Sequence, residues 1–527
     1  MQPHPPPAPT AVVRPPSTTD PVRVVVGLLL VLPAGIGLLV GQVWPTIRTL
    51  VISFQERSFL PAGSAESAGF DNYADVVGRE TFEAYGAAAL LPLLPLVALL
   101  LVGPLLAYAA HRAGRATRWT TRLVLAVPMV CFAPTAISVA WVVEHGLGDG
   151  QARAALWLGT FGLVAGLGVT LFLAVLRGRT PGRSGWPAGV TAGAVAGIAT
   201  VAVALQGFAY PILLGADTPV PLIYRIGFVL AAFGPAAAHG AVLFGVLLAL
   251  GVGAALIMIL SGLRLTIEPA TRPAPGSGSA GAAVATGAGL LVVLAIAGYG
   301  LWPWLSRLGE LDTGGDPSAV TVLVNTWLPP LLSSVVGVGL AAVAGFGIGA
   351  LRPLGRWSEL LLLPFAPWLF VGAGPLVVAR FDAARDGLFG NRIDTFLGLV
   401  PPGWLVVPAL FLFTLLFRGL SADAKAPASY RRMVVAALPM LVLAGAATWL
   451  VQSQSLLWSL VVGFSGGHLT GPVLATQQGT RLLADGALGL VLPLPAILVF
   501  AVGLGLLQLL YLDRLAIRTG RVGHNPD

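Results

Sequence analysis

The chain has 527 residues, of which 56% are hydrophobic and 10% charged, and its mean hydropathy is +0.87. Soluble proteins carry about 25% charged residues, so this composition excludes a soluble enzyme, a nucleic-acid-binding protein and a disordered chain. The net charge of +8 does not indicate a nucleic-acid partner, because the short inner loops of membrane proteins collect arginine.

Apolar runs long enough to cross a bilayer recur along the whole chain. The first 22 residues are proline-rich and predict a disordered tail. The run from Val24 to about Trp44 exceeds a signal-peptide core, so we interpret it as a retained first span. The further runs lie at about 84–110, 123–143, 155–176, 187–207, 227–262, 284–306, 319–350, 358–379, 396–417, 433–451 and 484–512. These runs predict an all-α polytopic membrane protein with about twelve transmembrane helices.

Proline inside several runs predicts kinks, which neighbouring helices tolerate by satisfying the freed carbonyls. The prolines concerned are Pro92, Pro95, Pro329, Pro330, Pro401 and Pro402.

Arginine sets the expected orientation. With the N-terminus inside, 20 of the 30 Arg and Lys residues fall in inner segments, whereas 16 of the 22 acids fall outside. Both termini are therefore expected in the cytoplasm. Lys425 is the only lysine among the 30 basic residues, and all the others are arginine. This preference for arginine over lysine suggests a GC-rich bacterial genome and hence a bacterial cytoplasmic membrane.

A linker rich in Pro, Gly and Ser divides the chain at 268–283. It separates two predicted six-span halves, residues 23–267 and 284–515, and a tail is expected at 516–527. Each half has an outer segment after its first span and then a long span that leads to an Arg-bearing inner loop, at 111–122 and 352–357. The halves resemble two related subunits fused into one polypeptide.

Several kinds of chemistry are missing from the sequence. Because Lys425 lies in ADAKAPAS, no G-x-x-x-x-G-K-[ST] phosphate loop exists, and we expect neither an enzyme nor a bound cofactor. The single cysteine, Cys131, and the absence of His or carboxylate clusters at ligand spacing argue against a metal site. Charged residues can all be placed in loops or at span boundaries, which disfavours a proton-driven carrier. His239 lies within a run, and we interpret it as a core histidine bonded to a neighbouring helix.

The segment after the first span carries an S-F dipeptide, Ser53-Phe54, and then a G-hydrophobic-x-N-Y box at 69–73. Residues 115–141 and 213–244 add dispersed matches. Together these resemble the sugar-type permeases of bacterial ABC importers, the maltose and glycerol-phosphate class. The second half resembles the partner permease of such systems through Asn325-Thr326 and through LSADAKAPASYRRMVVAALPM at 420–440.

The departures from that family concern its cytoplasmic coupling loop. The loop normally carries E-A-A, a glycine and I-x-L-P, and it forms a short helix in a groove of the ATPase. Here the second half keeps Leu438-Pro439, but Ser421 and Pro427 stand near the expected glutamate and glycine. The first half has RGRTPGRSGWPAG at 177–189 in its place. Standard ATPase coupling is therefore in doubt, at least through the first half.

The resemblance implies a translocation pathway for a polar solute, a carbohydrate above all, with cytoplasmic ATPase subunits and an extracytoplasmic solute-binding lipoprotein as partners beside membrane lipid. Our candidates for the pathway are Gln206, Phe208, Tyr210, Trp449, Gln452 and Trp458. Our candidates for ATPase coupling are Arg177, Arg179, Arg183, Asp423, Lys425, Ser429, Tyr430, Arg431 and Arg432. The aromatic residues can equally be interfacial anchors, and the arginines ordinary inner charge.

Two other functions stay open. A permease-derived scaffold that anchors or regulates other membrane proteins would account for the altered coupling loops. A secondary carrier with twelve spans is disfavoured by the lack of buried charge, although a sodium site built from carbonyls would escape that argument.

Overall fold

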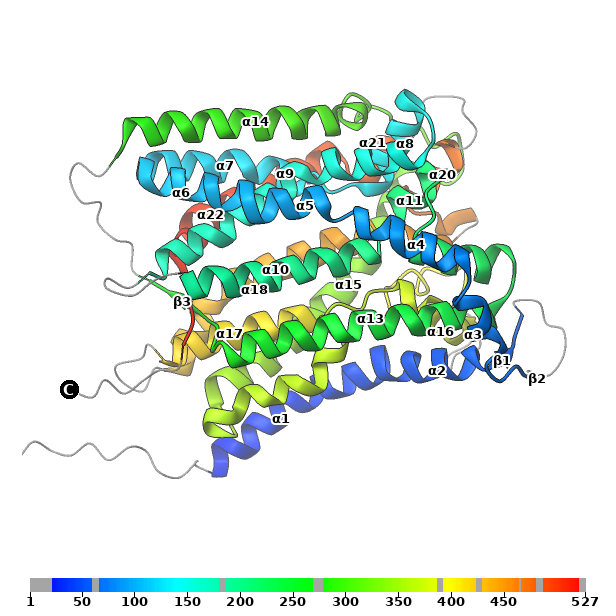
Figure 1. Cartoon of the computed structure of the whole chain (residues 1–527), viewed down its shortest axis with the longest axis horizontal. Helices are drawn as coiled ribbons and strands as arrows, with labels where there is room; N and C mark the ends of the chain where they lie inside the picture. The colour runs from blue at the N-terminus through cyan, green and yellow to red at the C-terminus, as the bar shows by residue number, and fades with distance from the viewer. Residues whose placement is uncertain are drawn as a thin grey trace, which may run out of the picture.

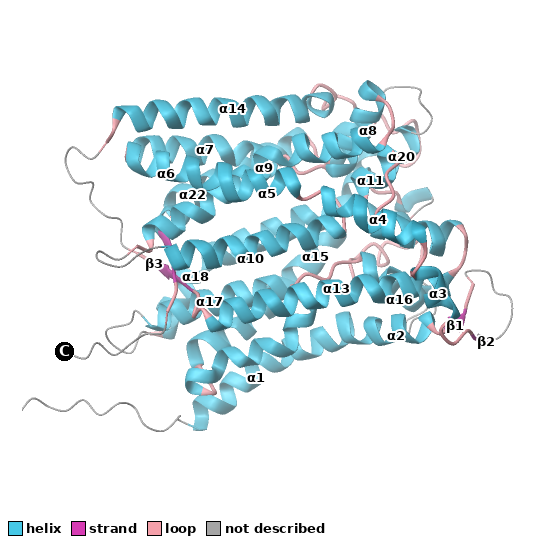
Figure 2. Cartoon of the chain, viewed as in Figure 1, coloured by secondary structure: helices cyan, strands magenta, loops and turns pink. Residues whose placement is uncertain are grey.

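The computed structural model describes residues 21–58, 66–179, 186–268, 278–385, 392–422, 429–463, 466–479 and 487–520. Within these ranges the chain is almost entirely helical, with two pairs of short antiparallel strands (Figure 2). Most of the predicted tail 1–22 and of the linker 268–283 lies outside them, as do residues 521–527. Ordered structure extends past residue 515, where we expected a tail, because Ala516–Arg518 belong to a strand.

The first predicted half begins with a long helical segment, Pro21–Ser53, and ends with another, Phe233–Leu260. Its helices are α1 Pro21–Leu38, α2 Trp44–Ser53, α3 Asp71–Val76, α4 Arg79–Leu90, α5 Leu93–Val97, α6 Gly103–Ala113, α7 Arg115–Val130, α8 Pro134–His145, α9 Asp149–Arg177, α10 Trp186–Leu205, α11 Ala209–Leu214, α12 Pro219–Tyr224 and α13 Phe233–Leu260. Its strands are β1 Gln55–Glu56, β2 Glu66–Ser67 and β3 Arg264–Ile267. Short π-helical turns, Leu39–Val43, Ala98–Val102 and Arg225–Val229, join or extend some of these helices.

The second predicted half contains nine α-helices and one long 3-10 helix among the described residues. Its helices are α14 Ala280–Leu305, α15 Ala319–Phe346, α16 Val377–Arg385, α17 Val407–Ala422, α18 Tyr430–Ser453, α19 Leu456–Val462, α20 Gly471–Gly479, α21 Leu488–Val491 and α22 Leu494–Leu510, followed by the strand β4 Leu515–Arg518. A π-helical turn, Gly347–Leu351, extends α15, and 3-10 segments lie at Gly355–Trp368, Gly374–Leu376, Gly466–His468 and Leu512–Arg514.

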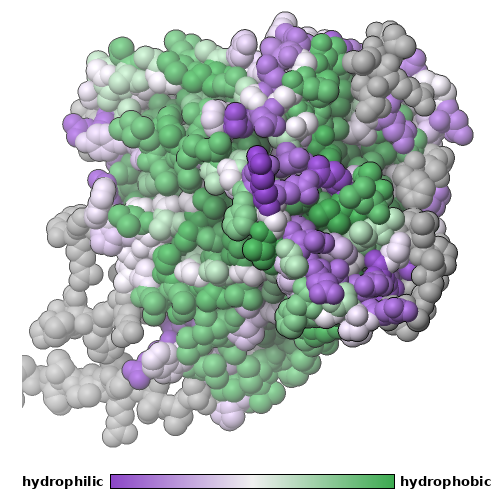
Figure 3. Space-filling model, turned by 45° about the vertical axis from the view of Figure 1, so that its right-hand side comes forward, coloured by the Kyte–Doolittle hydropathy of each residue, from purple (hydrophilic) through white to green (hydrophobic). Residues whose placement is uncertain are grey.

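The helices are those of a membrane protein. Among the described residues, nine helices are long and apolar enough to cross a bilayer, and α7 with α8 forms a tenth candidate bent by 75°. Large apolar side chains on them are exposed, such as Leu291 and Val499, and Figure 3 shows hydrophobic residues over much of the flank. A soluble protein does not expose so large an apolar surface. The predicted all-α, membrane-embedded class is confirmed.

These ten candidates coincide with ten of the twelve predicted runs, and the count of twelve stays a prediction. The run 358–379 instead forms the 3-10 helix Gly355–Trp368, a break at 369–373, and then the start of α16. Pro364 and Pro367 explain the lack of a regular α-helix, because proline removes a donor and clashes with the preceding turn. The run 396–417 yields only the 16-residue α17, which begins after Pro401 and Pro402.

The two predicted halves are intertwined rather than side by side. α1 packs against α15 of the second half, and α14 packs against α6 and α9 of the first (Figure 1). The largest buried apolar cluster likewise joins them, since it includes Ala254 on α13, Ala341 on α15 and Phe413 on α17. Each half therefore completes the core of the other.

The strands β3 and β4 tie the ends of the two halves together. β3 follows α13 and β4 follows α22, and the strands pair antiparallel from Arg264↔Arg518 to Ile267↔Leu515. The ladder continues reciprocally, because Glu268 N–H donates to Arg514 and Gly520 N–H donates to Ser261. α13 and α22 thus end at the same face, which also holds the start of α1 and which we call the terminal face (Figure 1). The opposite face holds β1, β2 and α3.

One predicted inner loop is helical. Residues 111–122 belong to the end of α6 and the start of α7, and only Gly114 separates the two helices. Gly114 has φ +103°, a conformation that side chains with a Cβ rarely adopt, so it makes the sharp turn. Helix α7 therefore carries Arg122 into the bundle, whereas Arg118 is half-buried and Arg115 is exposed.

Candidate functional site at the contact between the two halves

The third span of each predicted half breaks at a comparable place. In the first half, α7 ends at Val130 and α8 starts at Pro134. In the second half, the 3-10 helix ends at Trp368 and the next helical turn starts with Gly374-Pro375. A broken helix leaves backbone groups without intrahelical partners, and in membrane proteins such groups are buried in protein or line a cavity.

Gln206, a pathway candidate, reaches across to the break in the second half. Its Nε2 donates to the carbonyl of Phe370 at 2.7 Å, and its Oε1 accepts from Gly372 N–H at 2.7 Å. A side chain on the first half thus satisfies two backbone groups of the second. Among the described residues, Gln206 is the pathway candidate whose side chain forms hydrogen bonds to the other half.

Arg380 on α16 contacts the same break from the other side. Its guanidinium donates to the carbonyls of Gly372 and Gly41 and to Oε1 of Gln42, at 3.0–3.3 Å. Only 6% of Arg380 is exposed. Gln206, Gly372, Arg380 and Gln42 therefore form a continuous polar bridge between the halves, which we call the Gly372 bridge.

The other pathway candidates of the first half are buried. Phe208 packs edge-on against Tyr224 with ring centroids 5.5 Å apart, and 8% of it is exposed. Tyr210 belongs to a separate apolar cluster with Trp304. Burial raises the pKa of the Tyr210 hydroxyl above its ordinary value. Phe208 and Trp458 share one buried cluster, but Tyr210 lies outside it.

The candidates of the second half hold neighbouring helices together. Trp449 on α18 donates to the carbonyl of Trp327 on α15 at 2.8 Å, and Gln452 accepts from Ser334 at 3.1 Å. Trp458 on α19 donates to the carbonyl of Gly398 and is 4% exposed. The structure thus does not gather the six candidates around one space, and the Gly372 bridge is one of the polar clusters at the contact between the halves.

A second polar cluster ties the halves together on the side of the opposite face. The carboxylate of Asp382 on α16 is 1% exposed and binds Arg48 at 2.8 Å and Arg57 at 2.5 Å, with Arg385 at 3.7 Å. Sequence reasoning missed it, because residues 380–395 were assigned to an outer loop. The available signal was Gly374-Pro375, since proline favours the first helical turn and marks the start of the segment that leads into α16.

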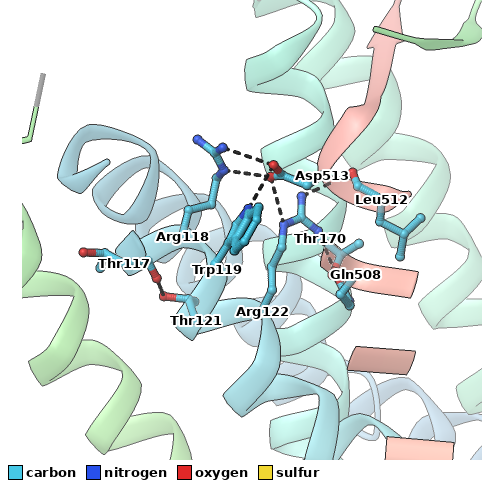
Figure 4. Close-up of polar contacts among 9 residues, drawn as sticks. All are labelled: Thr117, Arg118, Trp119, Thr121, Arg122, Thr170, Gln508, Leu512 and Asp513. Atoms are coloured by element: carbon cyan, nitrogen blue, oxygen red, sulfur yellow. Dashed lines mark hydrogen bonds and ion pairs between the residues drawn. The ribbon is translucent and has the colours of Figure 1, made fainter. Parts of the chain in front are cut away.

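A third cluster lies at the terminal face (Figure 4). Asp513, at the end of the last span, accepts from Arg118 at 2.8 Å and from the indole of Trp119 at 3.2 Å, and Arg122 lies 3.6 Å away. Arg122 also donates to Gln508 at 2.5 Å. The cluster joins α7 of the first half to α22 of the second. Arg122, at the boundary of the predicted run 123–143, is buried on α7.

The coupling candidates fall in two places. Arg177 and Arg179, at the end of α9, line a cavity of about 260 Å³ at the terminal face together with His111, Arg118, Arg122, Glu268 and Asp513. Ser429, Tyr430, Arg431 and Arg432 are exposed at the start of α18. Arg183, Asp423 and Lys425 lie outside the described residues.

The residues that carry the family resemblance make specific contacts. The hydroxyls of Ser53 and Tyr73 lie 2.7 Å apart, and Asn72 donates to the carbonyl of Ser53 at 2.9 Å. In the second half, Asn325 donates to the carbonyls of Gly467 and Leu469, while Thr326 accepts from Gly471 N–H at 2.8 Å. These two side chains thus hold the backbone in the described part of the segment 463–471.

His239 accords with its prediction. Its Nε2 lies 3.1 Å from the hydroxyl of Thr81 on α4, and its Nδ1 lies 2.9 Å from the carbonyl of Pro235. The interpretation as a core histidine bonded to a neighbouring helix is confirmed. Among the described residues, no three His, Cys, Asp or Glu side chains are grouped as a metal site would require.

Comparisons with known proteins do not assign the chain: no family model matches it, and no curated protein matches it.

The pathway candidates differ in their access to water, and cysteine labelling tests this. In a Cys131→Ser background, Gln206→Cys should react with a membrane-impermeant thiol reagent about ten-fold faster than Tyr210→Cys, because Gln206 is partly exposed and Tyr210 is 7% exposed. Phe82→Cys, at a side chain 68% exposed, calibrates full access. Equal rates at 206 and 210 would remove Gln206 from the pathway.

Proposed function

We propose that the chain is the membrane-spanning permease of an ABC-type importer in a bacterial cytoplasmic membrane. Its two halves enclose the pathway for a polar solute, with a carbohydrate as the leading class. An extracytoplasmic binding lipoprotein delivers the solute at the opposite face, and separate ATPase subunits act at the terminal face. The terminal face is accordingly cytoplasmic, as the arginine distribution predicts.

The observation that carries this proposal is the reciprocal relation of the two halves. β3 and β4 follow corresponding helices and pair at one face, so the halves run in the same direction through the bundle. An inverted repeat would place these ends at opposite faces. The exchange of first helices, α1 onto α15 and α14 onto α6 and α9, supports a tandem of two subunits fused into one chain.

The buried charges argue against a proton-driven carrier. Asp382 and Asp513 each lie among arginines, and Glu359 binds Arg418 at 3.0 Å. Arginine does not release its proton in proteins, so a carboxylate fixed between guanidinium groups is a structural tie rather than a relay. Energy for transport is then expected from another subunit.

An affinity purification tests the proposal. The tagged chain, gently solubilised from the bacterium that encodes it, should retain a protein that carries a phosphate loop and hydrolyses ATP. Substitution of both Arg431→Gln and Arg432→Gln should lower its recovery about five-fold, because an exposed charge pair contributes up to about 1 kcal/mol. Deletion of 420–432 should abolish it.

The matched control is Arg356→Gln, an exposed arginine at the terminal face on another segment, which should leave recovery unchanged. If the intact chain retains no ATPase, the proposal fails and the scaffold function gains. Uptake that survives ATP depletion but stops when the ion gradient collapses would instead identify a secondary carrier.

A further inference from the structure

An apolar groove of about 890 Å³ opens on the flank of the first half. It lies between the helical segment 93–113, the end of α9 and α10. Its walls are formed by Leu96, Leu100, Leu105, Gly193, Gly197 and Ile198. Gly193 and Gly197 deepen the groove along α10, because a glycine leaves open the space that a side chain would fill.

The groove opens toward the hydrocarbon of the bilayer. Leu100, Leu101, Leu105 and Val190 in its walls are 42–62% exposed, and they lie on helices that are long and apolar enough to span. Along α10 the groove runs from Val201 to Trp186, which at 1.5 Å per residue is about 22 Å. One leaflet of hydrocarbon is about 15 Å thick, so the groove has room for an extended acyl chain and the start of a headgroup.

The end of the groove at the terminal face is polar. Tyr108, Arg179 and Trp186 line it there, and Tyr108 and Trp186 are 48% and 75% exposed. Aromatic side chains with a polar group are enriched where the hydrocarbon meets the headgroups. This end therefore lies at the depth of lipid phosphates.

Arg179 also lines the basic cavity described above, together with Leu176. That cavity contains four arginines and only two carboxylates. Both carboxylates are engaged, since Asp513 binds Arg118 and Glu268 binds Arg518. Within the part of the chain that the structure describes, Arg179 forms no ion pair. The end of the groove at the terminal face thus has more positive than negative charge.

We propose that the groove and the cavity together bind one anionic phospholipid of the leaflet at the terminal face. An acyl chain lies in the groove against α10, and the phosphate is bound by Arg179 at the mouth of the basic cavity. Basic pockets between transmembrane helices on the cytoplasmic side bind anionic headgroups in this way. The site is independent of the proposed transport function, and it assigns Arg179 to lipid rather than to an ATPase.

Native mass spectrometry of the purified chain tests the site. Phosphatidylglycerol or phosphatidylcholine is added to the protein in detergent, and the protein is then released from the detergent in the spectrometer. It should retain phosphatidylglycerol in preference to phosphatidylcholine. Arg179→Gln should weaken that retention about five-fold, because one arginine near a lipid surface contributes about 1 kcal/mol. Gly193→Leu should weaken it by filling the groove, and a Cβ at this position would meet only ordinary contacts with Leu100 and Phe172.

Arg356→Gln, at the same face but away from the groove, should retain phosphatidylglycerol like the unaltered protein. Thermal unfolding in detergent without added lipid shows whether each variant is folded. Equal retention of the two lipids, or retention unchanged by both Arg179→Gln and Gly193→Leu, overturns the proposal. Displacement of the lipid by inorganic phosphate alone would also overturn it, because the acyl chain would then contribute nothing.

Discussion

Gly419→Ala should destabilise the protein by roughly 1–3 kcal/mol or more, the cost of overpacking a rigid contact. Gly419 lies near the end of α17, and a Cβ there would be 1.8 Å from the carbonyl oxygen of Leu265 in β3. This neighbour is backbone in a strand ladder, so it cannot move aside as a side chain would. Gly178→Ala at the end of α9 should act alike, because its Cβ would be 2.1 Å from the carbonyl oxygen of Ile517 in β4.

The control is Gly445→Ala in α18, where a Cβ would meet nothing within 4 Å. Alanine favours a helix over glycine by about 0.8–1 kcal/mol, so this variant should be unchanged or slightly more stable. The midpoint of thermal unfolding in detergent measures all three. If Gly419→Ala and Gly445→Ala gave the same midpoint, the strands would not be packed tightly against the helix ends.

These two glycines show why the strands matter for function. Gly178 belongs to the first half and contacts β4 of the second, whereas Gly419 belongs to the second half and contacts β3 of the first. One helix end from each half thus packs directly against the strand ladder. If the halves move relative to each other at the terminal face, where we place the ATPase, the ladder and these two helix ends must move together.

The spans could be predicted because the bilayer requires apolar runs of a given length.

Proline predicted the interruptions of the helices less well. α15 continues through Pro329 and Pro330, whereas the helix is interrupted at Pro92, between α4 and α5. Whether a proline bends or breaks a helix depends on neighbours that satisfy the freed carbonyls, and these neighbours come from other segments of the chain.

The polar ties between the halves could not be predicted from local pattern. Gln206 and Gly372 are 166 residues apart, and Arg48 and Asp382 are 334 apart. The sequence marks such residues as polar but does not pair them, so Gln206 was found as a candidate while Arg380 and Asp382 were assigned to a loop. The aromatic candidates Tyr210 and Trp458 were chosen for chemistry that the pathway needs, yet burial in apolar clusters is the commoner use of such rings.

Asp382→Asn should cost about 3 kcal/mol of stability, the lower end of the range for breaking a buried ion pair. The substitution keeps the shape of the side chain but leaves the guanidinium groups of Arg48 and Arg57 beside a neutral amide. The lower end applies because Arg48 is 36% exposed and retains some water. The carboxylate of Asp382 is only 1% exposed, unlike the carboxylate of a surface ion pair. Water therefore cannot solvate the guanidinium groups in its place.

Two comparisons separate this effect from a general loss of charge. Glu83→Gln removes an exposed partner of Arg79 and should leave the unfolding midpoint unchanged. Adding Arg48→Gln to Asp382→Asn should cost less than the sum of the two single changes, because the second substitution removes a charge that the first left unpaired. Strict additivity would mean that the two side chains do not interact, and the tie between α2 and α16 would then have to lie in apolar packing alone.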